Sequence, residues 1–278
     1  MLFVVSIVHA AVIFGQVLVG VFHSGAPFLW LTAYLTLAVG LSLSVLLLSS
    51  LADAAFRAAG RHLQPSASRS LVVAEALESC RAMAVFAGFA AWPRMLLLQG
   101  RPTALVWSLA AAQPNAPHNL ALYCVKLVAI TCLTDFYMYF KHRMLHAPRL
   151  FCFHKQHHAF HNPTPFASFA VAPVEAALTF APVLFLCLPS APVWAHAYAA
   201  WTAGFVALNL YLHSGVYVSF LETALPSLGL NSSAFHNVHH QSGGTRNFGE
   251  LLFIWDYFLG SGAHPAEAIE DGTVAKRI

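Results

Sequence analysis

The first 52 residues of the chain contain no aspartate, glutamate, lysine or arginine. This run is longer than the roughly 20 residues that cross a bilayer as one helix. The segment from His23 to Pro27 interrupts it, so two membrane helices are predicted, over residues 3–22 and 28–50. Across the chain 58% of residues are hydrophobic and 9% are charged, too little charge to cover a soluble protein. We therefore expect an integral membrane protein.

Later apolar segments predict further crossings. Residues 120–140 form a third apolar stretch, and residues 176–221 again lack charge. A turn at 189–192 divides the second of these into a helical hairpin. Residues 82–98 are a weaker candidate because a proline and an arginine interrupt them, and a shallow hairpin with residues 102–112 is the alternative.

Basic residues follow the second and third apolar stretches. They are Arg57, Arg61, Arg69, Lys141, Arg143 and Arg149. Lysine and arginine gather on the cytoplasmic side of membrane proteins, so both loops are predicted to be cytosolic. The predicted fold class is all-α: a multi-pass transmembrane helical bundle with a histidine-rich helical cap on its cytosolic side.

Several other classes of protein are disfavoured. A cleaved signal peptide needs a basic start and a polar chain after the cleavage site, and neither is present. The five cysteines form no CxxC pair, which argues against a disulfide framework or a zinc ribbon. The formal charge of +3 comes without a basic run interleaved with aromatics, so nucleic acid is not an expected partner.

The histidines carry the strongest signal in the chain. Eleven of the sixteen lie between His142 and His240, and most of these form three clusters. The first is an HxxxH pair, and the other two repeat one HxxHH pattern. Their members are His142 and His146; His154, His157 and His158; and His236, His239 and His240. On a helix, residues three and four apart share a face, so each cluster can present imidazoles to a metal.

The supply of imidazoles indicates two metal ions. Eight histidines exceed the four ligands of a structural zinc site, and no thiolate or carboxylate stands in the ligand positions. His213 ends the apolar hairpin and is a candidate ninth ligand or a hydrogen-bonding partner of one. His161 continues the spacing of the second cluster, but Asn162 and Pro163 end the segment. A coincidental or pH-sensing basic face is the alternative.

Three acidic residues lie near the clusters. Asp135 precedes His142 by two helical turns, so its carboxylate is predicted to accept the free N–H of a ligand imidazole. A charge at the end of a membrane helix is the alternative. Glu250 and Asp256 follow the last cluster and are candidates either to orient ligands or to form a solvated face.

Residues 134–261 resemble the fatty acid hydroxylase and sterol desaturase superfamily, whose members share HxxxH, HxxHH and HxxHH in this order. The residues from Asp135 to Arg143 resemble the segment that leads into the first cluster. Asn247-Phe248-Gly249 and Trp255-Asp256 resemble the segment that follows the last, which makes Asn247 a further candidate to support the ligands.

Within the superfamily, the second cluster followed by residues 163–168 resembles the sterol C5-desaturases, or lathosterol oxidases. This resemblance makes Thr164, Phe166 and Phe169 candidate substrate-binding residues. The chain departs from that branch at Phe169 and Ala172, where histidines are usual. Either the substrate differs from a typical sterol or those histidines are dispensable.

The resemblance implies an enzyme of the endoplasmic reticulum membrane with a cytosolic site of two non-haem iron ions. It implies dioxygen as co-substrate, electrons from NAD(P)H through cytochrome b5 and its reductase, and desaturation of a sterol. No haem-binding His-Pro-Gly-Gly core occurs, so a separate electron carrier is expected. The expected domains are 1–118, membrane-spanning; 119–261, catalytic; and 262–278, a polar tail.

Three other functions remain open. The nearest is a lipid hydroxylase that acts on a fatty acyl, sphingoid or sterol methyl group. A transporter or sensor of divalent metals would also place histidines at a membrane surface, although such sites usually include carboxylates within the membrane. A b-type haem protein would need axial histidines that face each other across a bundle.

Overall fold

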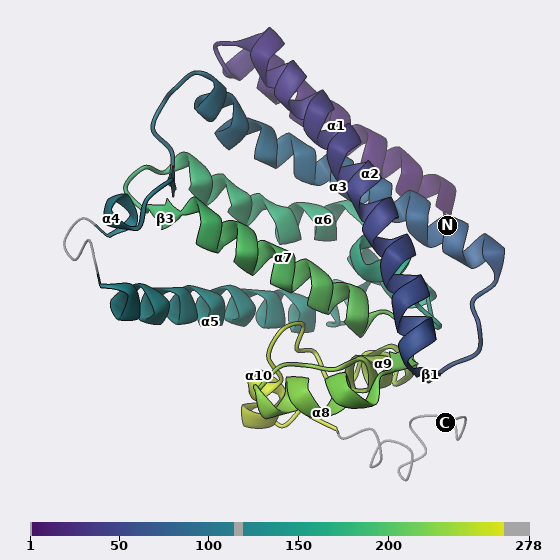
Figure 1. Ribbon diagram of the computed structural model, residues 1–278. Coiled ribbons are helices and arrows are strands. Elements are labelled where there is room, and N and C mark those ends of the chain that lie inside the picture. Colours follow the sequence, from purple (N-terminus) through teal and green to yellow (C-terminus); the bar gives the residue numbers. More distant parts are fainter. Residues whose placement is uncertain (1, 114–118, 264–278) are drawn as a thin grey trace. The chain divides into compact units, whose positions relative to one another are not determined.

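The computed structural model describes residues 2–113 and 119–263 (Figure 1). The chain is predominantly helical, as predicted. The polar tail predicted for 262–278 lies outside the described residues except for Gly262 and Ala263. The α-helices are α1 (Leu2–His23), α2 (Pro27–Ala59), α3 (Arg69–Leu98), α4 (Leu109–Ala112), α5 (Leu120–Leu145), α6 (Pro173–Phe180), α7 (Ala195–Leu212), α8 (Ser219–Ser227), α9 (Ser233–Gln241) and α10 (Ile254–Phe258).

Short 3₁₀ helices and strands complete the secondary structure. The 3₁₀ helices are Phe151–Phe153, His157–Ala159, Pro165–Phe169 and Ala181–Cys187. Strand β1 (Arg61–His62) pairs antiparallel with β4 (Val216–Tyr217), and β2 (Leu105–Val106) pairs in parallel with β3 (Val193–Trp194).

Two helices of the described chain, α2 and α5, are long and apolar enough to cross a membrane. The number of crossings stays a prediction. Helix α2 runs nine residues beyond its predicted end at residue 50. Residues 82–98 do not form a hairpin with 102–112: they are the second half of α3, which continues through Pro93, whereas 102–112 contain β2 and α4.

The chain forms two compact units, each assembled from described residues of three stretches. The first unit draws on 1–43, 81–133 and 173–204, and the second on 44–80, 134–172 and 205–278. The domain order predicted along the sequence is not tested by this division and stays a prediction.

The first unit has a core of large rings against small residues. Trp30 and Tyr34 of α2 stack with ring centroids 5.5 Å apart, and Ala87 and Ala91 of α3 are fully buried in the same cluster. A Cβ at Gly20 of α1 would lie 2.2 Å from the Trp30 ring, so only glycine fits there. This packing against α2 explains why α3 continues past Pro93, whose ring removes one hydrogen bond from the helix.

The second unit contains all of the histidine clusters. Its helices α8, α9 and α10 lie together in the green to yellow part of Figure 1. A small apolar core of Phe160, Ala167 and Ala170, with Leu71 and Ala74 of α3 against it, fixes the segment that follows the second cluster.

Candidate metal centre

The structure brings the nine histidines predicted as ligands into two groups, both in the second unit. The first group contains His142, His146, His154, His158 and His239, and the second contains His157, His213, His236 and His240. Within each group, one ring nitrogen of every member lies within 4.8 Å of the others. Eight of the nine side chains are buried, and His146 is partly exposed.

The paired histidines of each HxxHH cluster separate into different groups. His158 belongs to the first group and His157 to the second, and likewise His239 and His240 are divided between the two. Successive residues on a helix point about 100° apart, so neighbouring imidazoles face different directions. The doubled histidine therefore lets one short segment contribute to two sites.

The local structure of the clusters differs from a simple helical arrangement. His142 lies in the last turn of α5, and His146 follows the end of that helix. The third cluster lies on α9, as an i, i+3, i+4 pattern predicts. The second cluster instead lies around the 3₁₀ helix His157–Ala159, because the chain turns there rather than continuing as an α-helix.

His213 belongs to the second group rather than to its periphery. It follows the last residue of α7, and its Nε2 lies 3.4 Å from Nε2 of His157 and 3.2 Å from Nε2 of His236. Spacing along the sequence could not decide between direct and supporting roles, because 56 residues separate His213 from His157.

Backbone carbonyls fix four of the nine imidazoles through Nδ1. The distances are 2.8 Å from His142 to the oxygen of Phe248, 2.7 Å from His239 to Arg246, 3.0 Å from His213 to Asn209 and 3.4 Å from His157 to Ala170. A carbonyl can only accept, so Nδ1 carries the proton. In a neutral imidazole the lone pair then stands on Nε2, which is the atom that faces the group.

Burial keeps these side chains neutral. It holds the pKa of His157, His236 and His240 well below the usual range, with neighbouring imidazoles as the second cause. Burial also lowers the pKa of His213 to about 4 and that of His239 to about 3. Neutral imidazole is the form that binds a metal ion.

The Nε2 atoms stand where ligands of a common ion would stand. Neighbouring Nε2 atoms in the first group are 3.0–3.3 Å apart. Two nitrogens about 2.1 Å from one ion are about 3.0 Å apart at a right angle and about 3.4 Å apart at the tetrahedral angle. His157 and His213 both keep their proton on Nδ1, so their bare Nε2 atoms face each other at 3.4 Å, and a cation between them would offset the repulsion of their lone pairs.

His240 gives an independent indication that the second group fits a metal. The side chain is 2% exposed, yet neither ring nitrogen has a hydrogen-bond partner in the structure. A buried polar atom without a partner costs about 1–3 kcal/mol. Coordination of an ion by one of these nitrogens removes part of that cost.

Two of the predicted acidic residues, Asp135 and Glu250, hold segments around the site. Asp135 does not lie against an imidazole as predicted: it accepts hydrogen bonds from Nε1 of Trp255 and from the amides of Leu251 and Leu252. The segment after the third cluster covers the face of α5 two turns before His142. The N–H groups of that segment, rather than an imidazole, therefore contact the Asp135 carboxylate. Glu250 accepts from Lys141 at 3.2 Å, and the same oxygen lies 3.8 Å from Nδ1 of His142.

Asn247 and Asp256 fix the loop that orients His142 and His239. The Asn247 amide donates to the carbonyls of Phe235 and Ala263, and its oxygen accepts from the amide of Ala263. Asp256 accepts from the amides of Phe248 and Gly249 and from the hydroxyl of Ser261.

The predicted substrate-binding residues lie in a segment clamped by polar side chains. The hydroxyl and amide of Thr164 both donate to the carboxylate of Glu75, which is fully buried on α3. The hydroxyl of Ser79 donates to the carbonyl of Phe166. Contact of Thr164, Phe166 and Phe169 with a substrate stays a prediction.

Sequence reasoning missed Glu75 and Asn209. The Asn209 amide donates to the carbonyl of Ser168, and its own carbonyl holds His213. Glu75 is 89 residues from Thr164, so no local spacing relates the two. Charge alone could have drawn attention to Glu75, because it is one of only eleven acidic residues in the chain.

We expect Glu75→Gln to remove a pH dependence of stability. Burial raises the pKa of Glu75 to about 7, against hydrogen bonds from Thr164 that lower it. The folded chain therefore holds this proton more tightly than the unfolded chain, and stability falls as pH rises toward 7 and above. Between pH 6 and 7.5 the free energy of unfolding of the native chain should fall by about 1 kcal/mol more than that of the variant. Melting of both proteins in detergent across this range measures the difference, and parallel curves would contradict it.

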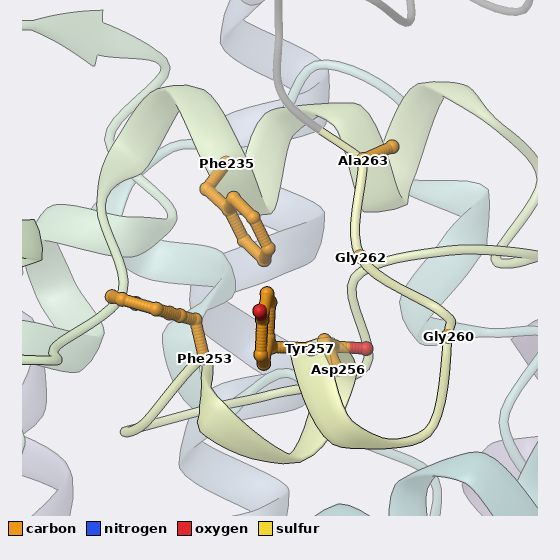
Figure 2. Close-up of a pocket in the computed structure, with 7 residues that line it drawn as sticks. All are labelled: Phe235, Phe253, Asp256, Tyr257, Gly260, Gly262 and Ala263. Atoms are coloured by element: carbon orange, nitrogen blue, oxygen red, sulfur yellow. The ribbon is translucent and has the colours of Figure 1, made fainter.

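An aromatic cavity of about 280 Å³ lies beside α9 and α10. Figure 2 shows the rings of Phe235, Phe253 and Tyr257 around it, with Asp256 and Gly260 at its edge. Phe235 immediately precedes His236, so the cavity and the second histidine group share one turn of α9.

Comparison with known proteins finds a family model and relatives that resemble the part of the chain that contains this site. Residues 127–261 match the family model described as Fatty acid hydroxylase, and this match includes all nine histidines. The match supports the resemblance of residues 134–261 to the fatty acid hydroxylase and sterol desaturase superfamily, which the three clusters predicted.

Its curated relatives include sterol desaturases. The chain is 32% identical over 142 residues to Delta(7)-sterol 5(6)-desaturase erg3B of Aspergillus fumigatus, covering 50% of this chain and 39% of the relative. It is 29% identical over 160 residues to Delta(7)-sterol 5(6)-desaturase ERG3 of Saccharomyces cerevisiae, covering 55% and 40%. Lathosterol oxidase of Homo sapiens is 27% identical over 157 residues, covering 54% and 49%. The chain thus spans less than half the length of these relatives, and no solved structure matches it.

Proposed function

We propose that the chain is a membrane-bound oxidoreductase that desaturates a lipid, most specifically a sterol, with dioxygen as oxidant. The observation that carries the proposal is the convergence of nine imidazoles into two groups, in each of which one ring nitrogen of every member lies within 4.8 Å of the others. Each group would hold one non-haem iron ion: His142, His146, His154, His158 and His239 the first, and His157, His213, His236 and His240 the second.

The protein's own contribution is to hold the ligands rigidly. Phe248, Arg246, Asn209 and Ala170 keep the protons of four imidazoles on Nδ1, so Nε2 stays available. Bound iron supplies the reaction of dioxygen with an unactivated C–H bond. Nitrogen ligands alone do not select Fe(II), since the same set binds Zn(II) more tightly, so supply in the cell determines the ion.

The proposed reaction balances with an external electron source. Desaturation takes two hydrogen atoms from adjacent carbons, and dioxygen with two electrons and two protons becomes two molecules of water. The electrons would come from NAD(P)H through cytochrome b5 and its reductase. The proposed location is the endoplasmic reticulum membrane, with the site on the cytosolic side, as the basic loops after the second and third apolar stretches indicate.

The sterol assignment is supported by the names of the relatives and by the segment after the second cluster. The relatives are sterol 5(6)-desaturases and lathosterol oxidases. Thr164, Phe166 and Phe169 lie on the segment of residues 163–170 whose Ala170 carbonyl orients His157, so a substrate against that segment would lie near the second group.

A yeast that lacks its own sterol C5-desaturase provides the test. Expression of this chain should restore C5-unsaturated sterols, measured by mass spectrometry. The double variant His157→Ala, His158→Ala removes a ligand from each group and should abolish the product. The variant His161→Ala should not, because His161 is exposed and outside both groups. Native protein that is inserted in the membrane yet leaves all sterols unchanged would contradict the sterol assignment.

Hydroxylation of a lipid is the second candidate function. Phe169 and Ala172 stand where the sterol C5-desaturase branch usually has histidines, and the matching family model is described as Fatty acid hydroxylase. In this reaction one oxygen atom of dioxygen enters the product and the other becomes water. The same cultures grown under ¹⁸O₂ would then contain a lipid heavier by one labelled oxygen.

A further inference from the structure

The exposed face of helix α10 is apolar. Tyr257 is 78% exposed, Phe258 is 73% exposed, and Leu259, which follows the helix, is 43% exposed. The charged residue of this helix, Asp256, points inward and is fully buried. Such a face is costly in water, because apolar area contributes about 25 cal/mol per Å² when it leaves water.

Helix α10 is fastened to the last turns of α5. The indole nitrogen of Trp255 donates to Asp135 at 2.7 Å, and the Trp255 ring packs edge-on against Phe136 at 5.3 Å between centroids. The amides of Leu251 and Leu252, just before α10, donate to the same carboxylate. These contacts set the position of α10 along α5.

The aromatic surface continues from α10 onto α5. Phe136 and Phe140 lie 4.5 Å apart between ring centroids and are 45% and 40% exposed. Helix α5 is one of the two described helices that are long and apolar enough to cross a membrane. Asp135 and Phe136 lie near the end of its apolar stretch, where a crossing helix leaves the hydrocarbon for the headgroups.

We propose that α10 lies in the membrane interface, with Tyr257, Phe258 and Leu259 inserted at the boundary between headgroups and acyl chains. Tryptophan and tyrosine are enriched at this level, where their rings are buried and their polar atoms stay hydrated. Short apolar faces of this kind bind the interface without crossing the bilayer. The occupant of this surface is thus lipid rather than protein. The inference rests on the membrane assignment in the proposed function.

Tyr257 also lines the aromatic cavity in Figure 2. Insertion of α10 therefore places one wall of that cavity beside lipid. The cavity wall and the exposed face share this residue, so a label at the neighbouring Phe258 reports on the environment of both.

Nitroxide accessibility tests the proposal in the full chain. The five cysteines are replaced with serine, Phe258→Cys is introduced and spin-labelled, and the protein is reconstituted into phosphatidylcholine vesicles. Power saturation compares collisions with oxygen, which concentrates in lipid, and with a nickel chelate, which stays in water. Labels at Val128→Cys and Thr245→Cys are the references, because Val128 is an exposed residue of the apolar stretch of α5 and Thr245 is an exposed residue of the loop after α9. Elution as a single species on size exclusion shows that each labelled protein is folded.

We expect the oxygen-to-nickel ratio at residue 258 to be several-fold higher than at residue 245 and to approach that at residue 128. A low ratio at 258 together with a high ratio at 128 overturns the inference and leaves the membrane assignment standing. Low ratios at both positions overturn the membrane assignment itself. A label at 258 that neither reagent reaches is covered by protein, from a second copy or from this chain, and this also overturns the inference.

Discussion

His213→Ala is expected to remove one of two bound metal ions and to abolish lipid oxidation. The second group would hold its proposed ion with four imidazoles, and His213 is the member whose Nε2 lies near both His157 and His236. Its loss would leave three ligands, so the proposed ion would be held more weakly. After reconstitution with Fe(II) and dialysis against a chelator, metal analysis should give about one ion per chain instead of about two.

The matched control uses the histidine that the groups leave out. His161→Ala should keep both ions, because His161 is exposed and belongs to neither group. His146→Ala leaves four imidazoles in the first group, as many as the second group has, so it should keep about two ions per chain. The double variant His146→Ala, His213→Ala should then keep about one. If His213→Ala holds two ions under the same chelator as the native protein, His213 is not a ligand.

The sequence was sufficient to select the nine histidines but not to divide them. Spacing of three and four residues marks a shared helical face, and this identified the HxxxH and HxxHH clusters. The division of His157 from His158, and of His239 from His240, depends on how the segments face each other. His213 shows the same limit, since its neighbours come from the second and third clusters rather than from α7.

Asp135 shows why a correct face can still give a wrong partner. Its distance of seven residues from His142 does put both on the same side of α5. The group that meets the carboxylate there is Trp255, which lies 120 residues later in the chain. Periodicity determines which way a side chain points, whereas the packing of distant segments determines what it touches.

Glu75 and Pro93 show two further limits. A buried carboxylate on α3 that holds Thr164 has no sequence signal except its charge, because tertiary packing alone brings these residues together. Pro93 interrupts the apolar pattern of the sequence, yet α3 passes through it. The loss of one helical hydrogen bond is offset by packing of that helix against Trp30 and Tyr34.

Asp256 links the fold of the loop to the orientation of a ligand. Its carboxylate accepts from the amide of Phe248 at 2.9 Å, the amide of Gly249 at 2.7 Å and the hydroxyl of Ser261 at 2.7 Å. The carbonyl of Phe248 in turn holds Nδ1 of His142 at 2.8 Å. Asn247 lies between His239 and Phe248 in the chain and has a left-handed φ of 57°. This conformation costs free energy and persists only where its surroundings enforce it.

We expect Asp256→Ala to destabilise the protein by at least about 3 kcal/mol, because three buried donors lose their acceptor at about 1 kcal/mol or more each. The same change should weaken metal binding in the first group, since Phe248 no longer holds His142 in place. Losses of metal affinity of about 10–100-fold are usual when such a supporting partner is removed. Thermal unfolding in detergent measures the first effect, and competition with a graded chelator measures the second.

Two further variants separate the lost hydrogen bonds from lost charge. Asp256→Asn keeps one acceptor oxygen but turns the other position into a donor that opposes a backbone amide, so its effect should be smaller than that of alanine. Glu250→Gln removes a negative charge but keeps an oxygen that can accept from Lys141, so it should cost less than Asp256→Ala. Equal losses from Asp256→Ala and Glu250→Gln would mean that general negative charge, rather than the hold on Phe248 and Gly249, stabilises the site. A loss of stability in Asp256→Ala with unchanged metal affinity would show that the loop keeps His142 oriented without its carboxylate clamp.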